Sequence, residues 1–191
     1  LAPGDAVFVD LNGDGVLNGD DATRDIGFTD IPEYTAGLNL GFSWKNFDFS
    51  MQWTGAWNVD RMLSEFRRPL GDTNSKALLL YQYETTWRSS EDTFTAKFPR
   101  ASNSHASNNY RGTDLYLINA SYLRLKNVEI GYNFDFPFMK KMKLDNCRLY
   151  INGYNLLTIT GFDWGDPESR QSDRPNYPLT RVFNIGLKVG F

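Results

Sequence analysis

The sequence predicts an all-β fold, a set of antiparallel transmembrane strands that forms part of the wall of a β-barrel. Several stretches of about ten residues alternate apolar and polar side chains, which places the apolar ones on one face of a strand. Large aromatic residues lie near the ends of these stretches, and the connections alternate between short and long. Outer-membrane barrels combine these three features as an apolar outer band, aromatic girdles and connections of unequal length.

The clearest alternation spans residues 36–57 and predicts a hairpin. On either side of Lys45-Asn46 the apolar residues fall at every second position, with small or polar residues between them. A two-residue turn there pairs Trp44 with Phe47 on the same side of the sheet, so both strands keep one apolar face. The residues of that face are Leu38, Leu40, Phe42, Trp44, Phe47, Phe49, Met51, Trp53 and Trp57.

Three further strands are expected later in the chain. In residues 117–134 the apolar positions change phase near Lys126-Asn127, which predicts a bulge there. Residues 147–160 alternate less regularly, and residues 183–191 alternate from Phe183 to Phe191. The sequence therefore predicts about five strands, all within residues 35–191.

The connections differ in length in a way that suggests an orientation. The turns at 45–46 and 135–145 are short, and the long loops are residues 1–34, 58–116 and 161–179. Because outer-membrane barrels have short periplasmic turns and long external loops, we expect the long loops to be extracellular. Residues 74–87 favour a short helix inside one of them.

Five strands do not make a complete barrel. Closure needs about eight strands, and an open edge in lipid leaves backbone groups without hydrogen bonds at several kcal/mol each. We therefore expect this chain to be part of a larger wall in contact with outer-membrane lipid. The alternative is a secreted soluble calcium-binding β-domain that binds glycans, in which the apolar face would pack on a second sheet.

Composition excludes several other classes. The net charge is −3 and no run of Lys or Arg occurs, so no nucleic-acid surface is expected. Cys147 is the single cysteine, which rules out an internal disulfide and a thiolate metal cluster. No apolar run reaches the length of a membrane-spanning helix. Asp166 and Glu168 flank a proline, which is typical of a turn rather than of a glycosidase pair, so no enzyme is expected.

Residues 8–21 carry the spacing of a calcium-binding loop. Calcium prefers six to eight oxygen ligands, and Gly15 falls at the sixth position of the loop, where the chain must turn sharply. The alternative is a plain polar turn, because Asn, Asp and Gly are also the commonest turn formers. We expect a bound Ca²⁺ with a structural role, held by Asp10, Asn12, Asp14, the carbonyl of Val16, Asn18 and Asp21.

The long loops contain residues that could contact a ligand. Trp87 and Trp164 could stack on a sugar or a peptide side chain, although packing within the loops is the alternative. Arg67 and Arg170 could face a ligand or a partner protein. No catalytic residue is proposed.

Several segments together resemble one known family. They are PGDAVFVDLNGDGVLNGDD near the start, TTWRSSEDTFTAKFPR at 85–100, ASYLRLKNVEIGYNF at 120–134, LYINGYNLLTITGFDWGDPE at 149–168 and YPLTRVFNIGLKVGF at 177–191. In these segments the chain resembles the C-terminal part of the SusC/RagA-type TonB-dependent outer-membrane transporters of Bacteroidetes.

This resemblance implies a 22-stranded barrel of the bacterial outer membrane, closed by an N-terminal plug and covered by a SusD-like surface lipoprotein. It also implies import of oligosaccharides or peptides, driven by a TonB complex that acts on the N-terminal part of the receptor. The plug and the energy-coupling segment are absent from these 191 residues. We therefore expect the chain to represent about the last five strands and their external loops.

Overall fold

The computed structural model describes residues 1–67, 80–103, 108–137, 144–169 and 179–191. They fall into two compact units. The sheet unit contains Ile31–Val59, Asn119–Ser169 and the last strand, and the loop unit contains Leu1–Asp30 and Asp60–Ile118. Each unit is described by itself.

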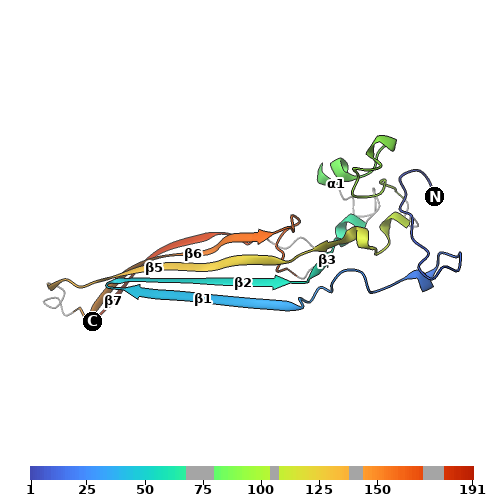
Figure 1. Cartoon of the computed structure of the whole chain (residues 1–191). Coiled ribbons are helices and arrows are strands. Elements are labelled where there is room, and N and C mark those ends of the chain that lie inside the picture. The colour runs from blue at the N-terminus through green and yellow to red at the C-terminus, as the bar shows by residue number, and fades with distance from the viewer. Residues whose placement is uncertain (68–79, 104–107, 138–143, 170–178) are drawn as a thin grey trace. The chain divides into compact units, whose positions relative to one another are not determined.

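The sheet unit is one antiparallel sheet of five strands in the order β1-β2-β5-β6-β7 (Figure 1). This confirms the predicted fold class and the predicted strands. Their bounds are β1 (Tyr34–Trp44), β2 (Phe47–Trp57), β5 (Tyr122–Phe134), β6 (Asn146–Thr160) and β7 (Val182–Gly190). Every strand pairs with the next long strand along the chain, as in an up-and-down barrel wall.

The predicted hairpin turn is confirmed in its register. Trp44 of β1 pairs with Phe47 of β2, and Lys45 adopts a left-handed conformation with φ of 56° in the turn between them. The row continues through Tyr132 of β5 and Leu149 of β6 to Leu187 of β7. Equivalent residues on five neighbouring strands therefore share one apolar face.

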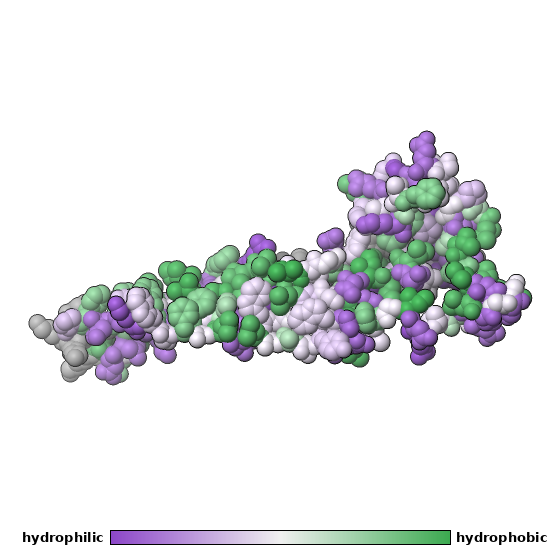
Figure 2. Space-filling view, viewed as in Figure 1, coloured by the Kyte–Doolittle hydropathy of each residue, from purple (hydrophilic) through white to green (hydrophobic). Residues whose placement is uncertain are grey.

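The second row of this face contains only apolar residues. Phe42, Phe49, Ile130, Ile151 and Ile185 follow one another across the sheet. Phe42 is 62% exposed and Ile185 is 72% exposed, so among the described residues no second sheet covers this face. The alternative of a soluble β-domain requires a second sheet that packs on this apolar face. Figure 2 shows apolar side chains gathered along the strands of the sheet.

The opposite face of the same strands is polar. Ser43, Asp48, Gly131, Tyr150 and Gly186 make up one row. The next row is Gly41, Ser50, Glu129, Asn152 and Asn184. A sheet with one apolar and one polar face suits a position between lipid and a water-filled interior.

The predicted bulge is confirmed, and one strand boundary is corrected. The pairing of β5 shifts register between Leu125 and Asn127, opposite a shift between Gln52 and Trp53 of β2. The expected strand at 117–134 is interrupted, because Leu117–Asn119 form a separate short strand, β4. β4 pairs with β3 (Asp60–Met62) in a sheet of two strands.

The loop unit is built mainly from short turns. It contains η1 (Gly19–Asp21), η2 (Ser64–Arg67), α1 (Leu80–Thr85), η3 (Ser90–Asp92), η4 (Asn108–Tyr110) and η5 (Asp114–Tyr116). The helix expected within 74–87 is found as α1, and residues 74–79 lie outside the described residues. Within the described residues, no helix is long and apolar enough to cross a membrane.

Candidate functional site

A charged cluster lies on the polar face of the sheet. Arg148 of β6 donates from Nε to Asp48 Oδ2 of β2 at 3.0 Å and from Nη2 to Glu129 Oε1 of β5 at 2.8 Å. Glu129 Oε2 accepts from Asn152 at 3.2 Å, and Asn152 Oδ1 accepts from Asn184 of β7 at 2.9 Å. The chain of contacts crosses four strands, so the polar face is fixed by side chains as well as by backbone pairing.

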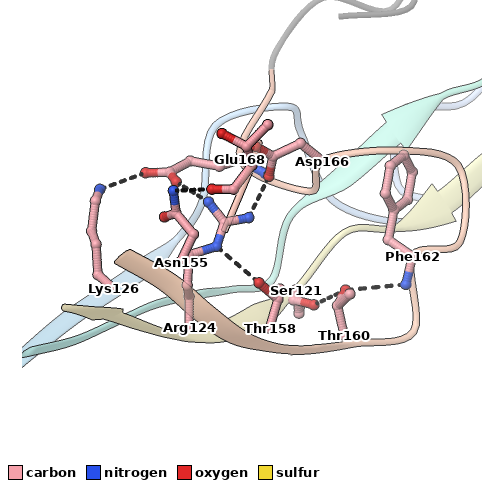
Figure 3. A network of polar contacts seen from close by, with 10 residues as sticks. Ser121, Arg124, Lys126, Asn155, Thr158, Thr160, Phe162, Asp166 and Glu168 are labelled. Carbon is pink, nitrogen blue, oxygen red and sulfur yellow. Dashed lines mark hydrogen bonds and ion pairs between the residues drawn. The ribbon is translucent and has the colours of Figure 1, made fainter. Parts of the chain in front are cut away.

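A second polar network fastens a loop segment to the same face (Figure 3). Arg124 of β5 donates from Nη1 to Glu168 Oε2 at 2.7 Å and from Nη2 to Asp166 Oδ1 at 2.5 Å. Its Nε donates to Thr158 Oγ1 of β6 at 3.0 Å. Asp166 and Glu168 thus both form ion pairs with Arg124.

The loop unit has a buried polar centre of its own. Asn109 is fully buried, accepts from the Ala6 backbone N–H at 2.7 Å and donates to Asp5 Oδ1 at 3.0 Å. Arg100 Nε donates to the same carboxylate at 2.6 Å. The Arg100 hydrogen bond, together with the Ala2 N–H, lowers the pKa of Asp5 to about 2. This centre ties residues 1–6 to the loop around residue 100.

Tyr116 lies beside this centre. Its ring stacks on that of Phe98 with the centroids 5.6 Å apart, and its hydroxyl donates to the carbonyl of Asn109. Burial raises the pKa of Tyr116 to about 12, so the phenol remains protonated as a donor. The loop unit therefore has a small core in which apolar packing and hydrogen bonds coincide.

The predicted calcium loop is curled by its own side chains. Asp10 accepts from the N–H groups of Gly13 at 2.7 Å and Gly15 at 2.8 Å. Asp21 Oδ1 accepts from Leu11 N at 2.9 Å and Oδ2 accepts from Asn18 N at 2.9 Å. These backbone N–H groups, led by that of Asn18, hold the pKa of Asp21 below its usual value. The aspartates at both ends of the motif thus hold backbone N–H groups from within the loop.

The donor set of this loop fits a hard cation. All six predicted ligands supply oxygen, and Gly13 and Gly15 take φ values of 75° and 81° that a side chain would oppose. The side chains of Asn12 and Asp14 are connected at 3.1 Å. Among the described residues, no group of three or more His, Cys, Asp or Glu side chains is arranged so that it could hold a metal ion, and this includes Asp10, Asp14 and Asp21.

Three of the four predicted ligand residues outside the calcium loop lie among the described residues. Trp87 is half-buried, its Nε1 donates to Thr93 at 3.4 Å, and its ring lies where a Cβ on Gly4 would stand. Arg67 donates to the carbonyl of Tyr110 at 3.3 Å. Both therefore have structural partners within the loop unit. Trp164 is half-buried in the sheet unit, and Arg170 lies outside the described residues.

Trp87 also lines a groove of the loop unit. The groove has a volume of about 1010 Å³, and its walls include Phe8, Val9, Leu17, Phe98 and Leu117. Residues of the predicted calcium loop and of the loop around residue 98 thus border the same groove. The sequence alone did not indicate that these two loops line the same groove.

Arg124 and Arg148 were missed by sequence reasoning. The signal that could have found them is the period of two, which places Asp48, Glu129 and Arg148 on the polar phase of three strands. Opposite charges on the same face of neighbouring strands are expected to pair.

Comparison with known proteins finds TonB-dependent receptors as relatives. The chain is 31% identical over 206 residues to TonB-dependent receptor P3 of Formosa agariphila, covering 99% of the chain and 19% of that receptor. It is 25% identical to TonB-dependent receptor SusC of Bacteroides thetaiotaomicron, covering 99% of the chain and 18% of SusC. A scan against protein-family models finds no match.

Solved structures share the fold. The RagAB peptide transporter matches with a TM-score of 0.64 and 22% identity over 84% of this chain and 17% of that chain. The closed-closed state of the RagAB peptide importer matches with a TM-score of 0.65 and 21% identity, over 93% of this chain and 20% of that chain. The chain thus spans about a fifth of the length of the curated relatives it matches.

The relatives agree with the two-faced sheet and with the predicted class. TonB-dependent receptors are proteins of the outer membrane and are not enzymes, in keeping with the expectation that the chain does no covalent chemistry. The match extends over nearly all of the chain in each curated relative. Over nearly its whole length the chain is homologous to a part of TonB-dependent receptors, SusC among them, and shares the fold of the corresponding part of the RagAB transporter.

Proposed function

We propose that this chain is part of an outer-membrane transporter that imports oligosaccharides or peptides together with a SusD-like surface lipoprotein. The observation that carries the proposal is the sheet with two faces. Its apolar rows suit lipid, and its polar rows, held by Arg148 and Arg124, suit the inside of a barrel. The energy for import comes from a TonB complex that acts on parts of the receptor outside these residues.

The loop unit supplies the external side of the transporter in this proposal. Its residues either precede β1 or lie between β2 and β5, and these connections leave the strands at the ends opposite the turn at Lys45-Asn46. If that short turn is periplasmic, the loop unit is extracellular and faces cargo and lipoprotein. The resemblance to a peptide transporter and to SusC leaves both cargo classes in the proposal.

The test uses the complete receptor in its own bacterium. An antibody against residues 58–116, applied to fractionated cells, is expected to detect an outer-membrane protein far heavier than the 21.9 kDa of this chain. Deleting the receptor is expected to abolish growth on one defined class of oligosaccharide or oligopeptide, and restoring the full-length receptor is expected to recover it. Unchanged uptake of every oligosaccharide and peptide tested would refute import.

The lipoprotein partner requires its own experiment. Affinity purification of the tagged receptor from solubilised outer membranes is expected to recover a surface lipoprotein in equal amounts. Treatment of intact cells with a protease that removes this lipoprotein is expected to reduce uptake without removing the barrel. Recovery of the receptor alone, with uptake unaffected by the treatment, would exclude the partner.

We further propose that residues 10–21 bind Ca²⁺ with a structural role. The support is the all-oxygen donor set and the curled backbone, in which Asp10 and Asp21 each accept two or more backbone N–H groups. Asp10, Asn12, Asp14, Val16, Asn18 and Asp21 would hold the ion, whose charge would offset the acidic side chains and stiffen the loop.

The calcium proposal has a direct test. The double variant Asp10→Ala, Asp14→Ala of the full receptor is expected to lose one bound calcium per chain while the barrel still assembles. Calcium is measured by elemental analysis, and assembly by the heat-dependent mobility of the folded barrel on gels. The matched control is Asp25→Ala, an exposed aspartate outside the motif. An unchanged calcium content in the double variant would disprove the site.

A further inference from the structure

Residues 161–169 are fastened to the sheet at both ends. At the first end, Thr160 Oγ1 donates to the carbonyl of Ser121 at 2.8 Å and accepts from the N–H of Phe162 at 3.0 Å. Phe162 is only 8% exposed. The chain leaving β6 is therefore held against the start of β5, as Figure 3 shows.

At the second end, a tight turn presents two carboxylates to one guanidinium. Asp166 Oδ1 accepts from the N–H of Glu168 at 3.0 Å, and the Asp166 carbonyl accepts from Ser169 at 3.0 Å. The turn directs Asp166 and Glu168 to different Nη atoms of Arg124. Pro167 between them is buried. This arrangement explains the Asp-Pro-Glu sequence as the holder of an ion pair.

Arg124 is almost completely enclosed in this arrangement. Its side chain is 3% exposed, and the ring of Tyr122 lies 5.4 Å from the guanidinium carbon. Lys126 adds a second cation, with Nζ at 3.4 Å from Glu168 Oε1. Two cations thus meet two carboxylates. A buried charge without its partner is strongly unfavourable. We therefore expect Asp166 and Glu168 to leave Arg124 together rather than one at a time.

The attachment lies on the polar face. Arg124 pairs with Thr54 of β2 and with Thr158 of β6, and these residues alternate with Trp53 and Leu157 of the apolar face. Thr54 Oγ1 and Asn127 Oδ1, on the same polar face, are shielded from solvent and have no hydrogen-bond partner within the described residues. These two polar atoms are therefore enclosed on the face to which the segment is attached.

We propose that residues 161–169 form a latched strap over the interior face of the barrel wall, and that Arg124 is the latch. The proposal rests on the proposed function only in calling the polar face the interior. While Arg124 holds Asp166 and Glu168, the strap shields the polar face at the level of Thr54. When the ion pair is broken, the strap lifts and opens that surface to the passage.

Two measurements on the full-length receptor in outer membranes test the latch, and neither requires transport. The first is cleavage after Glu168 by a glutamate-specific protease, detected by a C-terminal tag. The second is the labelling rate of Thr54→Cys by a water-soluble maleimide, in a receptor whose Cys147 is replaced by serine. Arg124→Gln is expected to raise both rates about tenfold, because local opening sets the access to each position.

The matched control is Lys126→Gln. It removes only the outer cation, whose side chain is 43% exposed, and is expected to leave both rates within about twofold of the parent. Arg124→Lys keeps the positive charge but loses the guanidinium, whose two Nη atoms donate to the two carboxylates. We therefore expect intermediate rates of cleavage and labelling. If Arg124→Gln does not assemble, the variant Asp166→Asn, Glu168→Gln breaks the same latch from the strap side.

Each outcome has a separate meaning. Unchanged cleavage and labelling in a folded Arg124→Gln receptor would show that Arg124 does not hold the strap, and would overturn the proposal. Faster cleavage with unchanged labelling would show that the segment does not shield the polar face, and would overturn it as well. A receptor that shows the latch but imports nothing would count against the proposed function alone.

Discussion

The guanidinium of Arg148 lies directly over the backbone of Gly131. A Cβ atom at residue 131 would come within 2.3 Å of Arg148 Nη2 and 2.6 Å of its Cζ. Arg148 starts on β6 and crosses β5 at Gly131 to reach Asp48 on β2. The absence of a side chain at one position thus allows an ion pair between strands that are not neighbours.

Gly131→Ala is expected to destabilise the barrel by about 1–3 kcal/mol, because the added methyl group displaces the guanidinium from Asp48. The measurement is urea unfolding of the refolded full-length receptor, followed by tryptophan fluorescence. Gly41→Ala is the control, since a Cβ there meets only the Phe49 carbonyl at 3.5 Å, an ordinary contact. Equal stabilities of the two variants would contradict the crossing role of Gly131.

The two threonines that flank Arg124 are expected to respond in opposite ways to the same substitution. Thr158→Val removes the acceptor of Arg124 Nε and leaves a buried charged donor unsatisfied, which costs about 1–3 kcal/mol. Thr54→Val removes a shielded hydroxyl that has no partner in the described part of the chain, and is expected to be neutral or stabilising. The midpoints of urea unfolding of the two variants measure this difference. A similar loss of stability in Thr158→Val and Thr54→Val would contradict the prediction.

The strand pattern was predictable because it is local. A period of two in side-chain polarity is set by the pleat, so the faces of β1, β2 and β7 follow from the sequence alone. The bulge near Lys126 was visible as a change of phase. β4 was not, because Leu117–Asn119 continue the extended sequence of β5 and differ from it only in their partner, β3.

The polar contacts were harder to foresee because they join distant residues. Asp5 and Asn109 are 104 positions apart, and Arg124 and Asp166 are 42 positions apart. Only the register of the sheet and the folding of the loops bring such residues together. For the same reason the sequence did not indicate the partners of Trp87 and Arg67, which pack on Gly4 and donate to the carbonyl of Tyr110, respectively.

The loop unit is expected to loosen in acid through Asp5. Its pKa is lowered from 3.8 to about 2, with the hydrogen bond from Arg100 as the largest cause. A carboxyl group whose pKa is lower in the folded than in the unfolded protein stabilises the folded state at pH values above its unfolded pKa. The contribution of Asp5 is therefore complete above about pH 4 and is lost as the pH falls to about 2.

Hydrogen exchange of the full receptor measures this loosening. Amides of residues 4–6, including that of Ala6 bound to Asn109, are expected to lose protection between pH 4 and pH 2, after correction for the intrinsic exchange rate. Asp5→Asn is expected to lose that pH dependence and to show low protection throughout. Protection that falls with the same pH profile in Asp5→Asn would assign the acid response to another group.

Gly15→Ala is expected to weaken the proposed calcium site about tenfold, because a φ of 81° is unfavourable for a residue with a Cβ. No atom lies within 4 Å of the added carbon, so the loss reflects backbone strain rather than a clash. Gly19→Ala is the matched control, since Gly19 has equal space and no left-handed φ. Calorimetric titration of the purified receptor with Ca²⁺ measures both affinities. Equal affinities would mean that the curled backbone of residues 10–21 does not set the binding of the ion.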